Sequence, residues 1–284
     1  MNPFPTLNGF GPTRKTLQRY ARALSAVARA HGVAHPHWWH ISLRVTPDGL
    51  QGDNVPLPGG GVLAGRLDLL RHELLLLASD GRRWSAPLTE GLSGTAMGER
   101  VLAAAADAGL RGAVERDRFE SDDPGVYDRE AAGRFFTALV GASLILKRHR
   151  ARLEGKTSPV QFWPHGFDLA MELYGTKMVR HEENGQTKEL PAQLNLGFYP
   201  GEDDDSSYFY SNPWPFDARQ LLDRPLPEGA GWHTEGWQGT MLPYAAVRDD
   251  PRAAERVLAY AGAVYDIACP YLRAQGSRGA GEQG

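Results

Sequence analysis

The sequence of 284 residues has one cysteine, Cys269, and no long hydrophobic run. A single cysteine cannot form an internal disulfide, and without a cationic neighbour in sequence it is expected to be a buried residue in a reducing compartment. The longest apolar stretches, ALVGASLIL and LLLLA, are much shorter than the roughly 20 residues that cross a bilayer. The N-terminus also lacks a basic segment followed by an apolar run, the pattern of a secretory signal. These absences predict a cytoplasmic protein without membrane contact.

The chain also lacks an excess of charge of one sign and the common catalytic motifs. It has 31 Lys and Arg against 34 Asp and Glu, a formal net charge of -3. No strong overall field therefore points to nucleic acid, and a small molecule is the expected partner. No GxGxxG follows a predicted strand, and GxxxxGK[ST], GxSxG and HExxH do not occur. Common nucleotide-binding sites, serine hydrolases and zincins are thereby disfavoured.

The first half of the sequence shows a helix, then strands, then a helix. Apolar residues recur at helical spacing over 13–31, and WWHISLRVT, residues 38–46, alternates as a half-buried strand does. Two strands follow at 65–70 and 73–79, and alanine-rich residues 98–110 predict a helix.

The second half repeats that order. Asp128 is placed to cap a long helix over 129–155, which ends in a run of basic residues. Asp250 and Pro251 begin a last helix that reaches Arg273. Strands are expected between these helices, at 166–174, 193–199 and 206–212.

These elements predict an α+β fold with antiparallel strands flanked by about four helices. The halves, about 13–110 and 126–273, also share a short signature, WWH and WPH, before their first strands. We therefore predict a single globular unit over 1–275, built from two weakly similar halves. Residues 276–284, rich in glycine and small polar residues, are expected to be a disordered tail.

The stretch GWHTEGWQG, residues 231–239, is the first candidate for chemistry. If it is extended, His233, Glu235 and Trp237 share one face, while Trp232 and Thr234 lie on the other. A histidine and a carboxylate on one face form an oriented base or two ligands of one metal. A structural role, with the indoles in the core and the imidazole bonded to backbone, remains the alternative.

Two other histidine-containing stretches are candidates. In QFWPHGFDLAMEL, alternation separates His165 from Asp168 unless the chain bulges near Pro164, and Asp168 could instead bind backbone or an arginine. In HGVAHPHWWH the histidine spacing matches no closed zinc site. Of these four histidines we select His40, which would share a strand face with Arg44.

Aromatic residues in the second half are candidates for the walls of a pocket. We predict that they bind substrate together with Asp168 and Arg44; they are Trp163, Tyr208, Tyr210, Trp214 and Trp237. Such residues also build protein cores, so a structural explanation stays open.

The function predicted from these residues is an enzyme acting on a small, partly aromatic or apolar molecule. His233 would be the acid or base, oriented by Glu235, while His165 and His40 would polarise the substrate or hold a metal. A divalent metal is a possible cofactor, with His165, His233 and Glu235 as candidate ligands. The alternatives are a small-ligand-binding protein without catalysis and a structural or interaction protein.

Five stretches together resemble a bacterial domain-of-unknown-function family, DUF5996. In chain order they are HPHWWHISLRVTPDGL, GKTSPVQFWPHGFDLAMELYG, LNLGFYPG, YFYSNPWP and GWHTEGWQGTMLPY. The resemblance covers nearly the whole chain and implies a single unit rather than a fusion, but no activity. The sequence departs from the family pattern mainly at 180–191, which is expected to be a variable loop.

Overall fold

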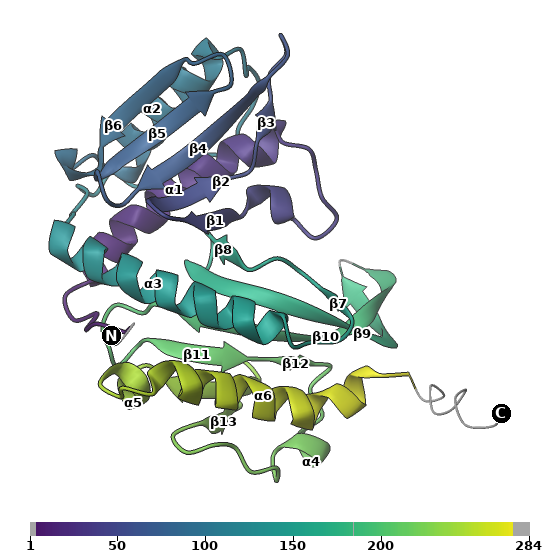
Figure 1. Cartoon of the computed structure of the whole chain (residues 1–284). Helices are drawn as coiled ribbons and strands as arrows, with labels where there is room; N and C mark the ends of the chain where they lie inside the picture. The colour runs from purple at the N-terminus through teal and green to yellow at the C-terminus, as the bar shows by residue number, and fades with distance from the viewer. Residues whose placement is uncertain (1–3, 184, 275–284) are drawn as a thin grey trace.

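A computed structural model of the chain, which describes residues 4–183 and 185–274, contains one continuous antiparallel sheet packed against helices (Figure 1). The α+β prediction is therefore confirmed. The helices are α1 (Gly11–His31), α2 (Gly94–Asp107), α3 (Arg129–Arg150), α4 (Ala218–Leu221), α5 (Ala245–Arg248) and α6 (Ala253–Leu272). Within the described ranges, no helix combines the length and hydropathy that crossing a membrane demands.

The sheet runs through both halves of the chain in the order β13-β14-β11-β10-β9-β8-β1-β2-β4-β5-β6. The strands of the first half are β1 (Leu43–Thr46), β2 (Gly49–Gly52), β3 (Val55–Pro56), β4 (Val62–Asp68), β5 (Glu73–Ala78) and β6 (Arg83–Pro87). Those of the second half are β7 (Lys156–Thr157), β8 (Gln161–Trp163), β9 (Asp168–Glu183), β10 (Gln186–Tyr199), β11 (Tyr208–Ser211), β12 (Pro213–Trp214), β13 (Gly231–His233) and β14 (Gly239–Pro243). The halves join where Leu43 of β1 pairs with Phe162 of β8.

The core lies between the sheet and the long helices. Phe135 of α3 packs against Phe162 and Phe167, while Tyr260 of α6 bonds Thr240 of β14. In the first half, Leu24 of α1 lies directly over Gly65 of β4, where an added Cβ would come within 2.7 Å of the leucine. Burial of this apolar surface is the main force that holds helices and sheet together.

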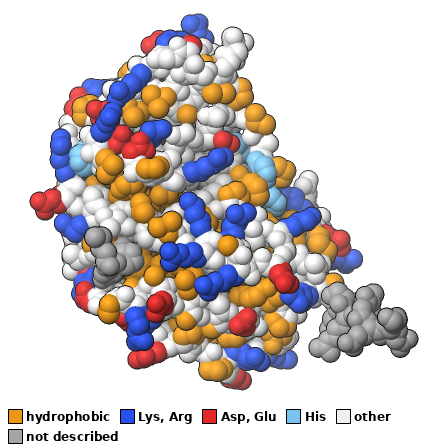
Figure 2. Space-filling view, in the orientation of Figure 1, with side chains coloured by type: hydrophobic (Ala, Val, Ile, Leu, Met, Phe, Trp, Pro, Cys, Tyr) orange, Lys and Arg blue, Asp and Glu red, His pale blue; other side chains and the backbone are white. Residues whose placement is uncertain are grey.

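The long helix α3 follows its sequence signals closely. The Asp128 side chain accepts hydrogen bonds from the amides of Glu130 and Ala131, as an N-cap residue does. Lys147, Arg148 and Arg150 occupy its last turn. Figure 2 views the molecule from the side on which α3 and α6 lie in front of the strands, and Lys and Arg side chains gather over α3. Their charge is favourable at the negative end of the helix.

Three local predictions were wrong. Residues 39–41 of the expected strand 38–46 form a short 3-10 helix, because Trp38 is left-handed with φ 59 and the chain turns before β1. The expected loop 180–191 mostly extends the β9–β10 hairpin, where Arg180 pairs with Glu189. Cys269 on α6 is half-buried rather than buried.

Two further predictions concern the C-terminus, the last helix and the tail. The last helix begins at Ala253, slightly later than expected, and the Asp250 carboxylate accepts a bond from the Arg252 amide just before it. The predicted tail, 276–284, lies outside the described residues.

Candidate functional site

The second half of the sheet turns one face toward α3 and α6 and the other face away from them. Phe162, Leu169, Phe198 and Phe209 lie opposite one another on adjacent strands and are fully buried on the helix side. Because strand side chains alternate, their neighbours form a second surface, here called the open face. Its half-buried members are Trp163, Asp168, Glu172, Tyr174, Asn195, Tyr199, Tyr208, Tyr210 and His233.

Asp168 and Tyr210 form the centre of the open face. The Tyr210 hydroxyl donates a hydrogen bond to Asp168 Oδ2 across β10. The ring can lie there because β10 has Gly197 beneath it, where an added Cβ would come within 2.2 Å of Tyr210 Cζ. Burial raises the pKa of Asp168 although the Tyr210 bond opposes the rise, and burial with the Asp168 charge raises the pKa of Tyr210. The tyrosine therefore stays protonated and remains a donor.

Glu172, four residues further along β9, is the most unusual acid of this face. Burial and, to a lesser extent, the nearby Asp168 charge together raise its pKa to about 7. Within the described chain, no Lys, Arg or His contributes to this shift or forms an ion pair with Glu172. A carboxyl group that titrates near neutral pH can both accept and donate a proton.

The turn between β8 and β9 is held by a stripe of α1. Arg14, Gln18 and Arg22 are spaced four residues apart, so they lie on one side of the helix. Gln18 Nε2 and Arg22 Nη2 donate to the His165 carbonyl, at 2.9 and 2.5 Å. Phe167 is left-handed, with φ 56, and its amide donates to the Trp163 carbonyl. This turn determines where β9 begins and therefore where Asp168 lies.

The His165 side chain projects from this turn beside the open face. The residue is exposed, and its ring contacts the edge of Trp163, with 5.7 Å between ring centroids. The surrounding protein still desolvates the imidazole enough to lower its pKa, while the Asp168 charge acts in the opposite direction. His165 and Asp168 therefore interact, because a turn replaces the regular alternation that would have separated them.

The GWHTEGWQG stretch is a hairpin rather than one extended strand. Its first strand, β13, ends at His233, and Gly236 has φ 79 in the following turn. Trp237 returns over the sheet to lie 4.3 Å from the His233 ring and 6.1 Å from that of Tyr208, measured between centroids. Glu235 is exposed at the turn and has no hydrogen bond to a described residue. The extended arrangement expected for His233, Glu235 and Trp237 was therefore wrong.

Trp232 is directed as expected, toward the opposite side from His233. It pairs with Thr240, whose side chain is buried against α6, and its indole donates to the Arg224 carbonyl at 2.9 Å. Phe216 contacts the indole edge-on, with 6.0 Å between centroids. Trp232 therefore packs on the helix side.

His40 does not share a strand face with Arg44. Its imidazole is buried within the turn before β1, where Nδ1 accepts a hydrogen bond from the His35 amide at 3.2 Å. Burial and the nearby Arg29 lower its pKa. These are the surroundings of a structural histidine, and the reason is the 3-10 helix that replaces the expected strand.

The remaining predicted residues lie at the margins of the open face. Arg44 is exposed on β1 and pairs with Asp53 at 3.3 Å. Trp214 on β12 pairs with Gln193 of β10 and contacts His181.

The turn that buries His40 contributes a further aromatic side chain to the open face. His37 contacts two aromatic rings, with 4.9 Å to the Tyr174 ring and 5.6 Å to the Trp39 ring between centroids. The first half of the chain therefore borders the site beside Tyr174.

The predicted site residues form a chain of contacts rather than one cluster. His165 interacts with Asp168, Asp168 with Tyr210, Tyr210 with Trp237, and Trp237 with His233. The two histidines are therefore at opposite ends of this chain. Among the residues that the structure describes, no three His, Cys, Asp or Glu side chains are grouped to hold a metal ion.

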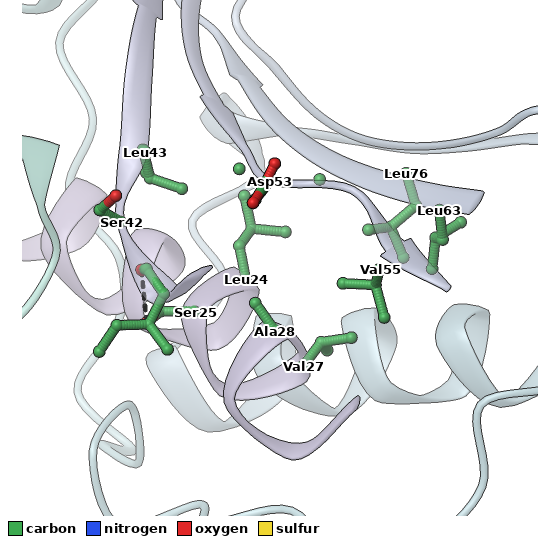
Figure 3. Close-up of a pocket in the computed structure, with 13 residues that line it drawn as sticks. Leu24, Ser25, Val27, Ala28, Ser42, Leu43, Asp53, Val55, Leu63 and Leu76 are labelled. Carbon is green, nitrogen blue, oxygen red and sulfur yellow. Dashed lines mark hydrogen bonds between the residues drawn. The ribbon is translucent and has the colours of Figure 1, made fainter. Parts of the chain in front are cut away.

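A small cavity lies elsewhere, between α1 and the sheet of the first half (Figure 3). Its volume is about 10 Å³, and its walls include Leu24, Val55 and Leu63. Beside it, Ser25 Oγ donates to the Ile41 carbonyl at 3.0 Å. This volume is too small for any ligand larger than one water molecule.

Sequence comparison places the chain in one family. The model of a family of unknown function, DUF5996, matches residues 4–275, so the chain belongs to that family. No curated protein and no solved structure matches the chain.

Proposed function

We propose that this member of the DUF5996 family is an enzyme that acts on a small molecule bound at the open face, with Glu172 as its general acid or base. The observation that carries the proposal is a half-buried carboxyl group with a pKa of about 7 beside Asp168. General acid–base catalysis is most efficient when the pKa of the catalytic group lies near the working pH. Strongly perturbed acids in a partly enclosed site are also typical of active sites.

Asp168 and Tyr210 support this role of Glu172. Tyr210 holds the Asp168 carboxylate by a hydrogen bond, and the Asp168 charge helps keep the Glu172 pKa high. In the proposed reaction, Glu172 exchanges a proton with the substrate while Asp168 and Tyr210 keep their positions. The pair are positioning residues, because they act through Glu172.

The acid–base role first assigned to His233, with Glu235 orienting it, passes to Glu172 in this proposal. Glu235 is exposed, whereas Glu172 is half-buried among aromatic rings. His233 then supports Trp237, the side wall of the site, and His165 lies beside Asp168 at the other end. The proposed chemistry uses no step through a divalent metal.

A binding protein without catalysis is the second candidate. Trp237 and Tyr208 lie nearly parallel, at an interplanar angle of 19°, and form an aromatic platform on which a planar ligand could stack. A purely structural role for these motifs has less support, since Trp163, Trp232 and Trp237 all retain solvent exposure. Full burial would have favoured that role.

The experiment that separates these functions is metabolite profiling with a matched pair of variants. The purified protein is incubated with a filtered small-molecule extract, and consumed and formed compounds are identified by mass spectrometry. We expect wild-type protein and the control Glu235→Gln to convert the same compound, and Glu172→Gln to lose at least about 100-fold in rate. Equal conversion by Glu172→Gln would remove Glu172 from catalysis, and no conversion by wild-type protein would favour the binding protein.

A further inference from the structure

Two carboxyl groups and one amide oxygen supply hydrogen-bond acceptors near the centre of the open face. The carboxyl groups of Asp168 and Glu172 flank Ala170, and Gln161 of β8 pairs with Ala170. Gln161 is only 3% exposed, and its Oε1 is buried with no hydrogen-bond partner among the described residues. A buried acceptor without a partner costs free energy, unless a water or a ligand supplies a donor.

The orientation of the Gln161 amide follows from its other contacts. Its Nε2 donates to Ser42 Oγ at 2.6 Å, and the same hydroxyl donates to the Trp39 carbonyl at 2.7 Å. Nε2 also lies 3.5 Å from the Trp39 carbonyl oxygen. Exchanging the amide atoms would bring Oε1 toward that oxygen, so the network determines the orientation. The free atom is therefore an acceptor.

Among the described residues, those that interact electrostatically with Glu172 provide no positive charge. Asp168 and Tyr174 flank it on β9, and Tyr210 faces it from β11. Each of these is neutral or negative. Arg14 and His165 lie on the Asp168 side, where the Arg14 guanidinium already donates to the Pro200 carbonyl and the Tyr199 hydroxyl, at 2.9 and 3.0 Å.

Aromatic rings accompany these acceptors. Tyr174 and Tyr210 interact electrostatically with Glu172. Aromatic faces attract organic cations, most strongly where water is partly excluded. The hydrogen-bond acceptors and the aromatic rings thus both favour an organic cation as ligand.

From this combination we propose that the open face binds a protonated organic amine, whose ammonium group pairs with Glu172 and donates to Gln161 Oε1 while its carbon skeleton lies on the aromatic rings. This inference rests on the proposed function, because it names the class of substrate for the same site. It adds the sign of the ligand's charge, which acid–base chemistry alone does not determine.

Binding of such an amine is coupled to the ionisation of Glu172. The free carboxyl group is mostly protonated below its pKa of about 7, whereas an ammonium group binds the carboxylate. An amine that remains charged throughout should therefore bind about tenfold more weakly at pH 6 than at pH 8. An ordinary exposed glutamate would be ionised at both values and would show no such change.

The test compares benzylamine with benzyl alcohol, which has the same ring and no charge, by isothermal titration calorimetry. At pH 8 we expect benzylamine to bind wild-type protein at least about tenfold more tightly. Glu172→Gln should bind the two compounds equally, and the control Glu235→Gln should keep the preference. Thermal denaturation of each variant checks that it is folded.

Several outcomes would overturn the inference. They are equal binding of the two compounds to wild-type protein, no binding of either, or a preference that does not change between pH 6 and pH 8. These results need only the wild-type protein, so they hold even if a variant does not fold. A preference for benzylamine without conversion of any extract compound would reject the proposed enzyme and keep the amine site. Conversion of an extract compound without a preference for benzylamine would reject the amine site and keep the proposed enzyme.

Discussion

Replacement of Gly197 by alanine should disrupt the centre of the open face more than its small size suggests. The added Cβ would lie 2.2 Å from Cζ, 2.4 Å from Cε1 and 2.5 Å from the hydroxyl oxygen of Tyr210. Ordinary van der Waals contact begins at 3.4 Å, so the ring must move by about 1 Å or more. That movement pulls the hydroxyl away from Asp168.

The magnitude follows from two losses and one smaller gain in stability. Overpacking of a tightly filled site costs about 1 to 3 kcal/mol. Loss of a hydrogen bond to a charged group costs about 1.5 to 3 kcal/mol, and the better strand propensity of alanine returns roughly 0.5 to 1 kcal/mol. A net loss of about 1.5 to 5.5 kcal/mol corresponds to a fall in Tm of roughly 3 to 22 °C for a domain of this size.

The assay is thermal denaturation followed by circular dichroism, with Gly231→Ala as the matched control. Gly231 also lies on a strand, β13, but an added Cβ there would meet no atom within 4 Å. Its replacement should leave Tm almost unchanged. In the double variant Gly197→Ala with Tyr210→Ala, the loss should be smaller than the sum of the single losses, because the clash disappears with the ring. Equal Tm values for Gly197→Ala and Gly231→Ala would refute the reasoning.

Three further predictions concern single residues. Folding raises the Glu172 pKa from 4.5 to about 7, so the free energy of unfolding of the wild-type protein should fall as pH rises through that range. Above pH 7, Glu172→Gln should therefore be more stable than wild type by up to about 3 kcal/mol. Parallel stability curves for the two proteins, measured by urea denaturation between pH 4 and 9, would contradict this. In the same assay, His40→Ala should lower the free energy of unfolding by about 2 to 4 kcal/mol, because it leaves a cavity and an unpaired His35 amide. The variant should keep its affinity for benzylamine. Unchanged stability with lost binding would make His40 a ligand-binding residue. Arg14→Leu should lower the free energy of unfolding by about 2 to 4 kcal/mol, because it removes the hydrogen bonds to the Pro200 carbonyl and the Tyr199 hydroxyl. A melting temperature equal to that of wild type would show that these bonds contribute nothing to stability.

The helices and most strands were predictable because their signals are local. Periodicity and the Asp128 cap are properties of neighbouring residues, and the structure keeps both. The strand predicted at 38–46 failed because the chain there follows contacts that periodicity does not contain. His40 closes a turn by accepting a bond from the His35 amide, and Trp38 has φ 59. An alternating pattern of large residues therefore supports a tight aromatic turn as well as a strand.

The positions of some predicted site residues follow from the same local signals. Asp168, Tyr210 and Trp163 were selected as polar or aromatic residues near strand ends, and all three lie on the open face. Glu172 was missed, although the alternation in DLAMEL places it on the same face as Asp168. The rise in its pKa comes from burial by neighbouring strands and from the Asp168 charge, which no local pattern records. Conversely, Gly236 was a turn signal that argued against one extended strand from His233 to Trp237.

The position of Asp168 depends on the first half of the chain as well as on the second. Gln18 and Arg22 of α1 donate hydrogen bonds to the His165 carbonyl, and His37 contacts Tyr174 further along β9. The pairing of β1 with β8 also covers a sheet edge that the second half alone would leave open. Separation of the halves would therefore remove the bonds that determine where β9 begins. Since Asp168 and Glu172 both lie on β9, the proposed site requires both halves even though its acidic residues come from one.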